Sequence, residues 1–246
     1  MSQQPPAPPK TRWTGAAAGG AAGFLALALY LLFWPVGVEP EPWRPPEAPS
    51  LEALLAPGRR LSPVERLDLD GASGPEAVAV DGRGRIYTGT RDGRILRLEP
   101  GPGDARIRTF ARTGGRPMGL AFDRGGRLLV ADLERGLLAV GRDGAVEVLA
   151  ESAGGRTLGR TNGVAVGPDG TIYFTDASWA HPDAPALVPL VAHRPTGRLL
   201  AHDPETGRTR VLLDSLRFAN GVAVDPGGGF LLISETAAYR VRRVDL

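Results

Sequence analysis

The sequence contains no cysteine, and only one of its 29 basic residues, Lys10, is a lysine. The absence of cysteine excludes disulfide bonds and thiolate metal sites, and it is compatible with a reducing or an oxidising compartment. The 29 basic residues nearly balance 27 acidic ones. No cluster of basic residues of the kind that binds nucleic acid occurs along the chain, so we expect no nucleic-acid partner.

Two common catalytic motifs are also missing. The sequence has neither a Gly-x-Ser-x-Gly nucleophile elbow nor a phosphate-binding P-loop. Their absence argues against a serine hydrolase of that type and against an NTPase. The 246 residues are enough for one large all-β domain.

The N-terminal region predicts a membrane anchor. Residues 1–14 are polar and rich in proline, which predicts a short disordered tail. Residues 15–38 carry no charge and have a strongly apolar centre, long enough to cross a bilayer as a helix. Because Lys10 and Arg12 precede it, the N-terminus is expected to be cytoplasmic and the rest of the chain extracytoplasmic.

A cleaved signal peptide is the alternative for the same segment. No small-x-small cleavage site follows the apolar run, which passes directly into Trp34-Pro35-Val36-Gly37. The sequence therefore favours an uncleaved signal-anchor helix in a single-pass membrane protein.

The chain changes character after the anchor. Residues 39–60 are rich in proline and glutamate and predict a stiff linker. Over residues 61–246, short apolar runs alternate with glycine-containing turns at intervals of about ten residues, which is typical of consecutive antiparallel hairpins. The clearest predicted strand pairs are Arg85–Thr90 with Arg94–Leu98 and Arg127–Asp132 with Leu137–Val140.

Four related phrases recur within this region. In each, a short turn precedes an apolar run, and the residue before the run is Glu76, Met118, Asn162 or Asn220. The residues that follow these four are 42, 44 and 58 residues apart. A period of about 40 to 50 residues with four strands per unit predicts the blades of an all-β propeller. We expect the third interval to be longer because residues 179–193 form an inserted loop.

The first strand of each propeller blade borders the central channel, so equivalent positions in successive blades converge. Glu76, Asn162 and Asn220 are therefore expected to face a common point. One carboxylate and two carboxamides form an oxygen-only set that suits Ca²⁺ better than Zn²⁺. The alternative is that both Asn-Gly pairs are turn dipeptides.

Two aspartates at predicted strand ends, Asp132 and Asp176, are weaker candidates. Either would be a catalytic base or a supporting group near the channel, or else a residue that starts a turn. The sequence does not separate these roles.

The region from Gly74 to Leu246 resembles the six-bladed β-propeller superfamily of strictosidine synthase, the gluconolactonases and the paraoxonases. Within it, the similarity is to the branch of the strictosidine synthase-like proteins and the adipocyte plasma membrane-associated protein. The motifs that carry the resemblance are Gly74-Pro75-Glu76, Ile86–Thr90 with Asp92-Gly93, Tyr173–Ser178, Gly197–Leu200 and Val211–Val222.

This resemblance implies a calcium ion in the channel, held by Glu76, Asn162 and Asn220. It also implies a single-pass membrane protein with an external propeller. The chain departs from the paraoxonases at Met118, where their catalytic histidine would fall. A six-bladed propeller needs more residues than 61–246 supply at the observed period, so we expect about four blades and a fragment of a longer protein.

The predicted function is that of a membrane-anchored, calcium-dependent hydrolase of esters or lactones. In this hypothesis the metal polarises the carbonyl, and Asp176 assists the attacking water. One alternative is a strictosidine synthase-like lyase that condenses an amine with an aldehyde, and another is a non-catalytic propeller that binds a ligand.

Overall fold

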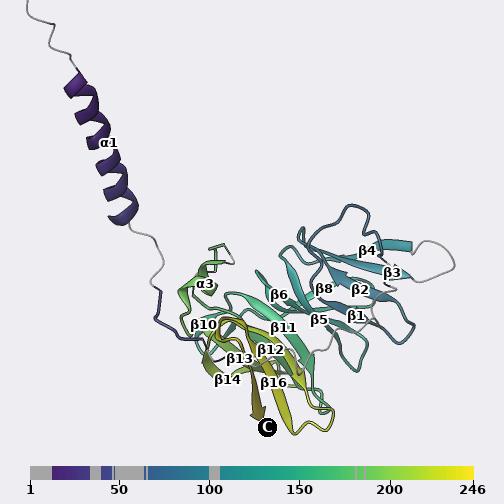
Figure 1. Ribbon diagram of the computed structural model, residues 1–246. Coiled ribbons are helices and arrows are strands. Elements are labelled where there is room, and N and C mark those ends of the chain that lie inside the picture. The colour runs from purple at the N-terminus through teal and green to yellow at the C-terminus, as the bar shows by residue number, and fades with distance from the viewer. Residues whose placement is uncertain are drawn as a thin grey trace, which may run out of the picture. The chain divides into compact units, whose positions relative to one another are not determined.

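The structure is a computed structural model of the chain (Figure 1). It describes residues 13–33, 40–45, 47, 64, 66–99, 106–180, 182–185 and 187–246. Most of the predicted tail over 1–14 and of the predicted linker over 39–60 lies outside these residues. The chain divides into two compact units, Met1–Glu39 and Pro40–Leu246.

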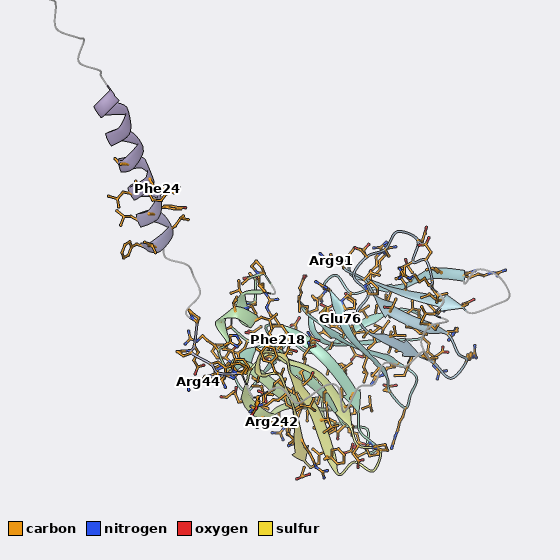
Figure 2. The ribbon with its side chains drawn as sticks, viewed as in Figure 1. Phe24, Arg44, Glu76, Arg91, Phe218 and Arg242 are labelled. Atoms are coloured by element: carbon orange, nitrogen blue, oxygen red, sulfur yellow. The ribbon has the colours of Figure 1, made fainter. Side chains whose placement is uncertain are left out.

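The first unit contains the helix α1, Trp13–Phe33. Its sequence is rich in alanine and leucine, which have high helix propensity. Large apolar side chains project from it, including Phe24, which is 76% exposed (Figure 2). Among the described residues, no helix combines the length and apolarity needed to cross a membrane. The predicted helix is therefore present, whereas the transmembrane span predicted over 15–38 is not confirmed.

The second unit is built from antiparallel sheets, which confirms the all-β prediction for residues 61–246. The sheets follow one another along the chain, and within each sheet the strands pair in chain order (Figure 1). The strands of the four larger sheets are β1 (Val78–Val80), β2 (Ile86–Gly89), β3 (Arg94–Glu99) and β4 (Arg106–Arg112); β5 (Pro117–Phe122), β6 (Leu128–Asp132), β7 (Gly136–Val140) and β8 (Val146–Ala150); β11 (Thr161–Val166), β12 (Ile172–Asp176), β13 (Gly197–Asp203) and β14 (Arg208–Leu216); and β15 (Ala219–Val224), β16 (Phe230–Glu235) and β17 (Arg240–Asp245).

An aspartate fixes the turn between the first two strands of the first sheet. The Asp81 Oδ1 atom accepts hydrogen bonds from the backbone N–H groups of Arg83 and Arg85, 2.9 and 3.0 Å away. This is the local bonding that makes aspartate a turn former. The same device recurs in the other sheets at Asp123, Asp169 and Asp225.

Three apolar clusters form the core, and each lies between two consecutive sheets. Tyr87 of the first sheet packs in one cluster with Val130 of the second. Leu129 of the second sheet packs with Phe174 of the third. In the third cluster, Leu199 of the third sheet packs with Ile233 of the fourth. Face-to-face packing of successive sheets buries the apolar side chains of the central strands.

The insertion over 179–193 is only partly the loop that the sequence predicts. It contains a short helix, α3 (Leu187–Ala192), whose last carbonyl accepts a hydrogen bond from the backbone of Glu41. The Trp43 ring is stacked on the rings of His193 and Tyr239, and its centroid lies 5.0 and 5.1 Å from theirs. Tyr239 follows the short 3-10 helix η1 (Thr236–Ala238). These contacts fasten residues 40–45 to the third and fourth sheets.

Candidate functional site

The repeated phrases lie at irregularities in the first strands of the sheets. In β5, β11 and β15 the pairing register shifts at the start of the strand. A bulge of this kind redirects side chains and removes backbone groups from the ladder. The shifted stretches contain Met118, Asn162 and Asn220. Neither asparagine, nor the glycine after it, has a positive φ, so the alternative that these pairs are turn dipeptides is wrong.

Side-chain hydroxyls satisfy the backbone groups that the bulges release. The Gly163 N–H donates to Thr175 Oγ1 at 2.8 Å, and the Gly221 N–H donates to Ser234 Oγ at 2.7 Å. The Thr175 hydroxyl in turn donates to the Asn220 carbonyl, which joins the third sheet to the fourth. The site thus contains two hydroxyl residues, Thr175 and Ser234, that the sequence did not single out.

Glycine allows the first strands of neighbouring sheets to approach closely. A Cβ at Gly119 would lie 2.4 Å from the Asn162 carbonyl oxygen, and one at Gly163 would lie 2.6 Å from that of Asn220. No side chain fits at either position, so glycine is required there. Met118, Asn162 and Asn220 therefore form a continuous row across three sheets, which we call the inner row.

Glu76 lies in the loop that leads into β1 (Figure 2). Its carboxylate is 4.0 Å from the guanidinium of Arg116, which lies two residues before Met118. Both side chains are partly exposed, so the pair is weak. Among the described residues, no hydrogen bond joins Glu76 to either asparagine.

Each of the two asparagines has an amide oxygen that accepts no hydrogen bond from a described residue. Asn162 is 7% exposed, and its side chain makes no hydrogen bond to any described residue. The Asn220 Nδ2 atom donates to Thr236 Oγ1 at 3.1 Å. Its Oδ1 atom is left available to a ligand. Both amides can therefore offer oxygen to a bound group.

Asp176 has a structural environment. Its Oδ1 atom accepts hydrogen bonds from the backbone of Gly159 and Arg160, and its Oδ2 atom pairs with Arg198. Asp176 and Arg198 are 0% and 1% exposed at their side chains. With both oxygens engaged and no access to solvent, Asp176 lacks the geometry expected of a catalytic base.

Acidic residues at the ends of the second strands in other sheets bind backbone N–H groups as Asp176 does. Asp132 accepts a hydrogen bond from the backbone of Arg116, and Glu235 accepts one from the backbone of Arg217. In each case the bonded N–H lies at the entry to the first strand of the same sheet. The sequence signal for this contact is an arginine one to two residues before the first strand together with an acid at the end of the second.

The carboxylate and amide oxygens of Glu76, Asn162 and Asn220 are of the kind that binds calcium. Ca²⁺ takes 6 to 8 oxygen ligands and accepts carboxylates and amide carbonyls. Glu76, Asn162 and Asn220 would supply three oxygens and a single negative charge. The described residues contain no cluster of three or more histidine, cysteine, aspartate or glutamate side chains that could hold a metal. A metal site here would therefore depend on the two asparagine amides.

Family comparisons match two segments of the chain. Residues 55–98 match the N-terminal region of the strictosidine synthase-like family, and residues 162–245 match strictosidine synthase. The second segment includes Asn162 and Asn220, and the first includes Glu76.

Two relatives illustrate the similarity. The human adipocyte plasma membrane-associated protein is 38% identical over 239 residues, which cover 88% of this chain and 55% of that protein. The strictosidine synthase-like 7 protein of Arabidopsis thaliana is 39% identical over 158 residues, covering 63% of this chain and 43% of that protein. The chain spans about half the length of these curated relatives.

A solved structure supports the fold. The gluconolactonase of Xanthomonas campestris aligns with a TM-score of 0.60 and 21% identity, over 72% of this chain and 60% of that one. At this identity the likeness shows a shared propeller-like fold.

Proposed function

The chain belongs to the strictosidine synthase-like family, and from this premise we propose that it binds calcium at the inner row and hydrolyses esters or lactones of small molecules. The observation that carries the proposal is the placement of Asn162 and Asn220. They occupy equivalent bulges on adjacent first strands, and no described residue donates a hydrogen bond to either amide oxygen.

The residues of the site have distinct tasks in this proposal. Asn162 and Asn220 present amide oxygens from a fixed stretch of backbone. The hydroxyl oxygens of Thr175 and Ser234 hold the bulges by accepting hydrogen bonds from the backbone N–H groups there. Glu76 supplies the negative charge, and its carboxylate lies 4.0 Å from the guanidinium of Arg116, the residue before β5. A calcium ion held there would supply Lewis-acid polarisation of a carbonyl oxygen. Asp176 does not act as the base in this proposal, because one of its oxygens accepts backbone hydrogen bonds and the other pairs with Arg198.

Hydrolysis assays test this activity. Phenyl acetate and δ-valerolactone would be offered to the protein with calcium and with excess EDTA. We expect turnover only with calcium, and its loss in Asn162→Leu, which keeps the size of the side chain but removes its oxygen. Asn162→Asp keeps an oxygen and should retain turnover. Hydrolysis that continues unchanged in EDTA contradicts the proposal.

Non-catalytic ligand binding is the second candidate function. Met118 occupies one end of the inner row and cannot ionise, and Asp176 is bound to Arg198. Glu76 is therefore the only titratable group that the proposed set offers to a ligand. A site without a placed base suits binding better than proton transfer. Calcium binding without turnover of any ester or lactone would favour this candidate.

We also propose that the protein associates with membranes through α1. Its leucine and phenylalanine side chains near Phe33 are 70–75% exposed, and the human relative is named as plasma membrane-associated. Transfer of exposed apolar helix surface from water into lipid is favourable, because it lowers the free energy. Replacement of Leu31 and Leu32 by serine should release the protein from sedimented membranes, whereas alanine replacements should release less. Equal sedimentation of all three forms would overturn this proposal.

A further inference from the structure

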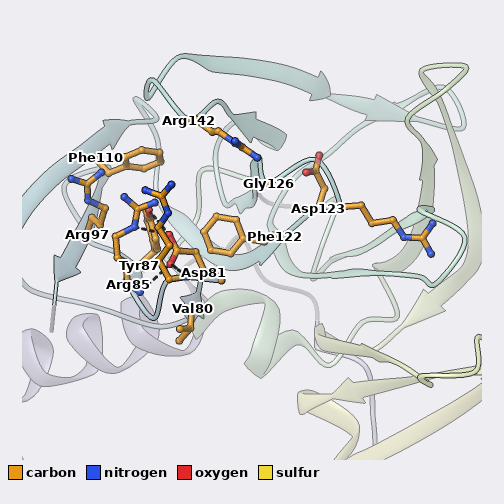
Figure 3. Close-up of a pocket in the computed structure, with 13 residues that line it drawn as sticks. Val80, Asp81, Arg85, Tyr87, Arg97, Phe110, Phe122, Asp123, Gly126 and Arg142 are labelled. Carbon is orange, nitrogen blue, oxygen red and sulfur yellow. Dashed lines mark hydrogen bonds and ion pairs between the residues drawn. The ribbon is translucent and has the colours of Figure 1, made fainter.

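A pocket of about 630 Å³ lies between the first and second sheets, at the opposite end of the first strands from the inner row (Figure 3). Glu76 precedes β1 and Met118 lies near the start of β5, whereas Val80 and Phe122, which end these strands, line the pocket. The volume is in the range of small-molecule sites. The pocket is therefore separate from the proposed calcium site.

Aromatic rings form one wall of this pocket. The Tyr87 ring meets Phe110 edge-to-face at 5.1 Å and Phe122 at 5.2 Å. Tyr87 is 2% exposed, which fixes its ring in the core. The two phenylalanines flank it within the pocket lining (Figure 3). Such a wall offers a rigid apolar surface to a planar ligand.

Three of the five arginines that line the pocket are each anchored by part of the guanidinium group. Arg85 Nε binds Asp81 at 2.7 Å, Arg97 Nη2 binds Glu99 at 2.8 Å, and Arg142 Nη2 donates to a backbone carbonyl at 3.0 Å. A guanidinium has five N–H donors. Among the described residues, the remaining donors of these three side chains have no hydrogen-bond acceptor, and Arg97 Nε is buried without one.

The pocket has excess positive charge. Five arginines and two aspartates line it. Both aspartates are already paired, Asp81 with Arg85 and Asp123 with Arg127, at 2.7 and 2.8 Å. Burial raises the pKa of the Asp81 carboxyl, but hydrogen bonds from Arg85 and its charge outweigh that effect and hold the pKa below its usual value. The two aspartates therefore stay bound to their arginines. Arg97, which gives only Nη2 to Glu99, and Arg142, which gives only Nη2 to a backbone carbonyl, keep their other donors for a ligand.

We propose that this pocket binds a small aromatic anion. The ring packs against Phe110 and Phe122, and the anionic group accepts hydrogen bonds from Arg142 and Arg97. Arginine recognises carboxylates and phosphates through paired N–H donors, and anchoring lowers the entropy that such a side chain loses on binding. The proposal requires both halves of the ligand, because the apolar wall and the arginines lie in one hollow.

Calorimetry with phenyl phosphate tests the proposal on the full chain. Phenol and inorganic phosphate serve as probes of each half alone. We expect phenyl phosphate to bind at least about 10-fold more tightly than either, since each half adds contacts that the other lacks. EDTA should not change this affinity, which separates the pocket from the calcium site.

Variants locate the binding. Arg142 is exposed, so Arg142→Gln should fold normally and weaken phenyl phosphate binding by roughly 10-fold or more. Phe122→Leu keeps an apolar side chain and should weaken phenyl phosphate but not inorganic phosphate. Arg208→Gln removes an exposed arginine outside the pocket and should have no effect. Equal affinity of Arg142→Gln and Arg208→Gln, or equal binding of phenyl phosphate and phosphate, overturns the proposal.

Discussion

Thr175 is the single residue on which the inner row depends most. Its hydroxyl accepts the Gly163 N–H and donates to the Asn220 carbonyl, while its side chain is fully buried. The sequence predicted Asn162 and Asn220 because their phrase repeats. Thr175 was not predicted, because its partners are 12 and 45 residues away and nothing local reveals the bulge that needs it.

Replacement of Thr175 tests its place in the row. Thr175→Val keeps the shape but leaves a buried N–H and a carbonyl without their partner, which costs about 1–3 kcal/mol of the free energy of unfolding. Thr175→Ser keeps the hydroxyl and should lose less. Urea unfolding of the three proteins measures both. A valine variant as stable as the wild type would show that the hydroxyl contributes nothing.

We expect the stability of the protein to depend on pH through a second single residue, His202. Burial lowers its pKa below 6.5, and Arg127 acts in the same direction, while Asp203 and Glu147 oppose the shift. The folded protein keeps the ring neutral, whereas the unfolded chain takes up a proton below about 6.5. The stability that depends on neutral His202 is therefore fully present above pH 6.5. It is lost as the pH falls from there through the lower pKa of His202 in the folded protein.

Melting temperatures at pH 7 and pH 5 measure this effect. We expect the wild type to lose more stability over this interval than His202→Gln, which cannot ionise. The Thr209 hydroxyl that contacts His202 Nδ1 remains available to the glutamine. Parallel curves for the two proteins would exclude His202 as the cause.

The elements are joined where the second strand of a sheet ends. Asp176, at the end of β12, binds the backbone that enters β11 and pairs with Arg198 of β13. Arg198 also donates to the carbonyls of Ala153 and Thr157, in the hairpin of β9 (Ser152–Ala153) and β10 (Arg156–Thr157). One buried ion pair thereby fixes two strands and the connector before them.

Asp176→Asn should be among the most destabilising single changes in the chain. It leaves Arg198 charged, buried and without its counter-ion, which costs about 3–5 kcal/mol. Asp92→Asn removes the partner of Arg94 in an exposed pair and should change stability little. Chemical unfolding compares the two. A similar, small loss of the free energy of unfolding in both variants would mean that Asp176 does not hold the strands. Asp176 would then again be a candidate base.

Elements could be predicted from the sequence where the pattern is local. The expected strands at Arg85–Thr90 and Arg127–Asp132 correspond to β2 and β6 within a few residues, because short apolar runs bounded by glycine-containing turns determine them. The helix α3 within 179–193 was missed, since three prolines in that stretch favour irregular chain. Strand bulges were also missed, because they depend on pairing.

At the scale of the whole molecule, the repeat predicts which first strands meet, and the structure places three of the four phrases in one row. The period alone carries that information. The aromatic-anion pocket could not be predicted in the same way. Its residues Arg97, Phe110 and Arg142 come from three strands or turns with no shared motif, and only the packing of the first sheet on the second brings them together.

The most direct test of the central claim is calcium binding by isothermal titration calorimetry. We expect one calcium site in the wild-type protein, its loss in Asn162→Leu and in Asn220→Leu, and its retention in Asn162→Asp, where an oxygen ligand remains. Calcium should raise the melting temperature of the proteins that bind it and of no others. Equal calcium affinity in the wild type and both leucine variants would contradict the assignment of the inner row as a metal site.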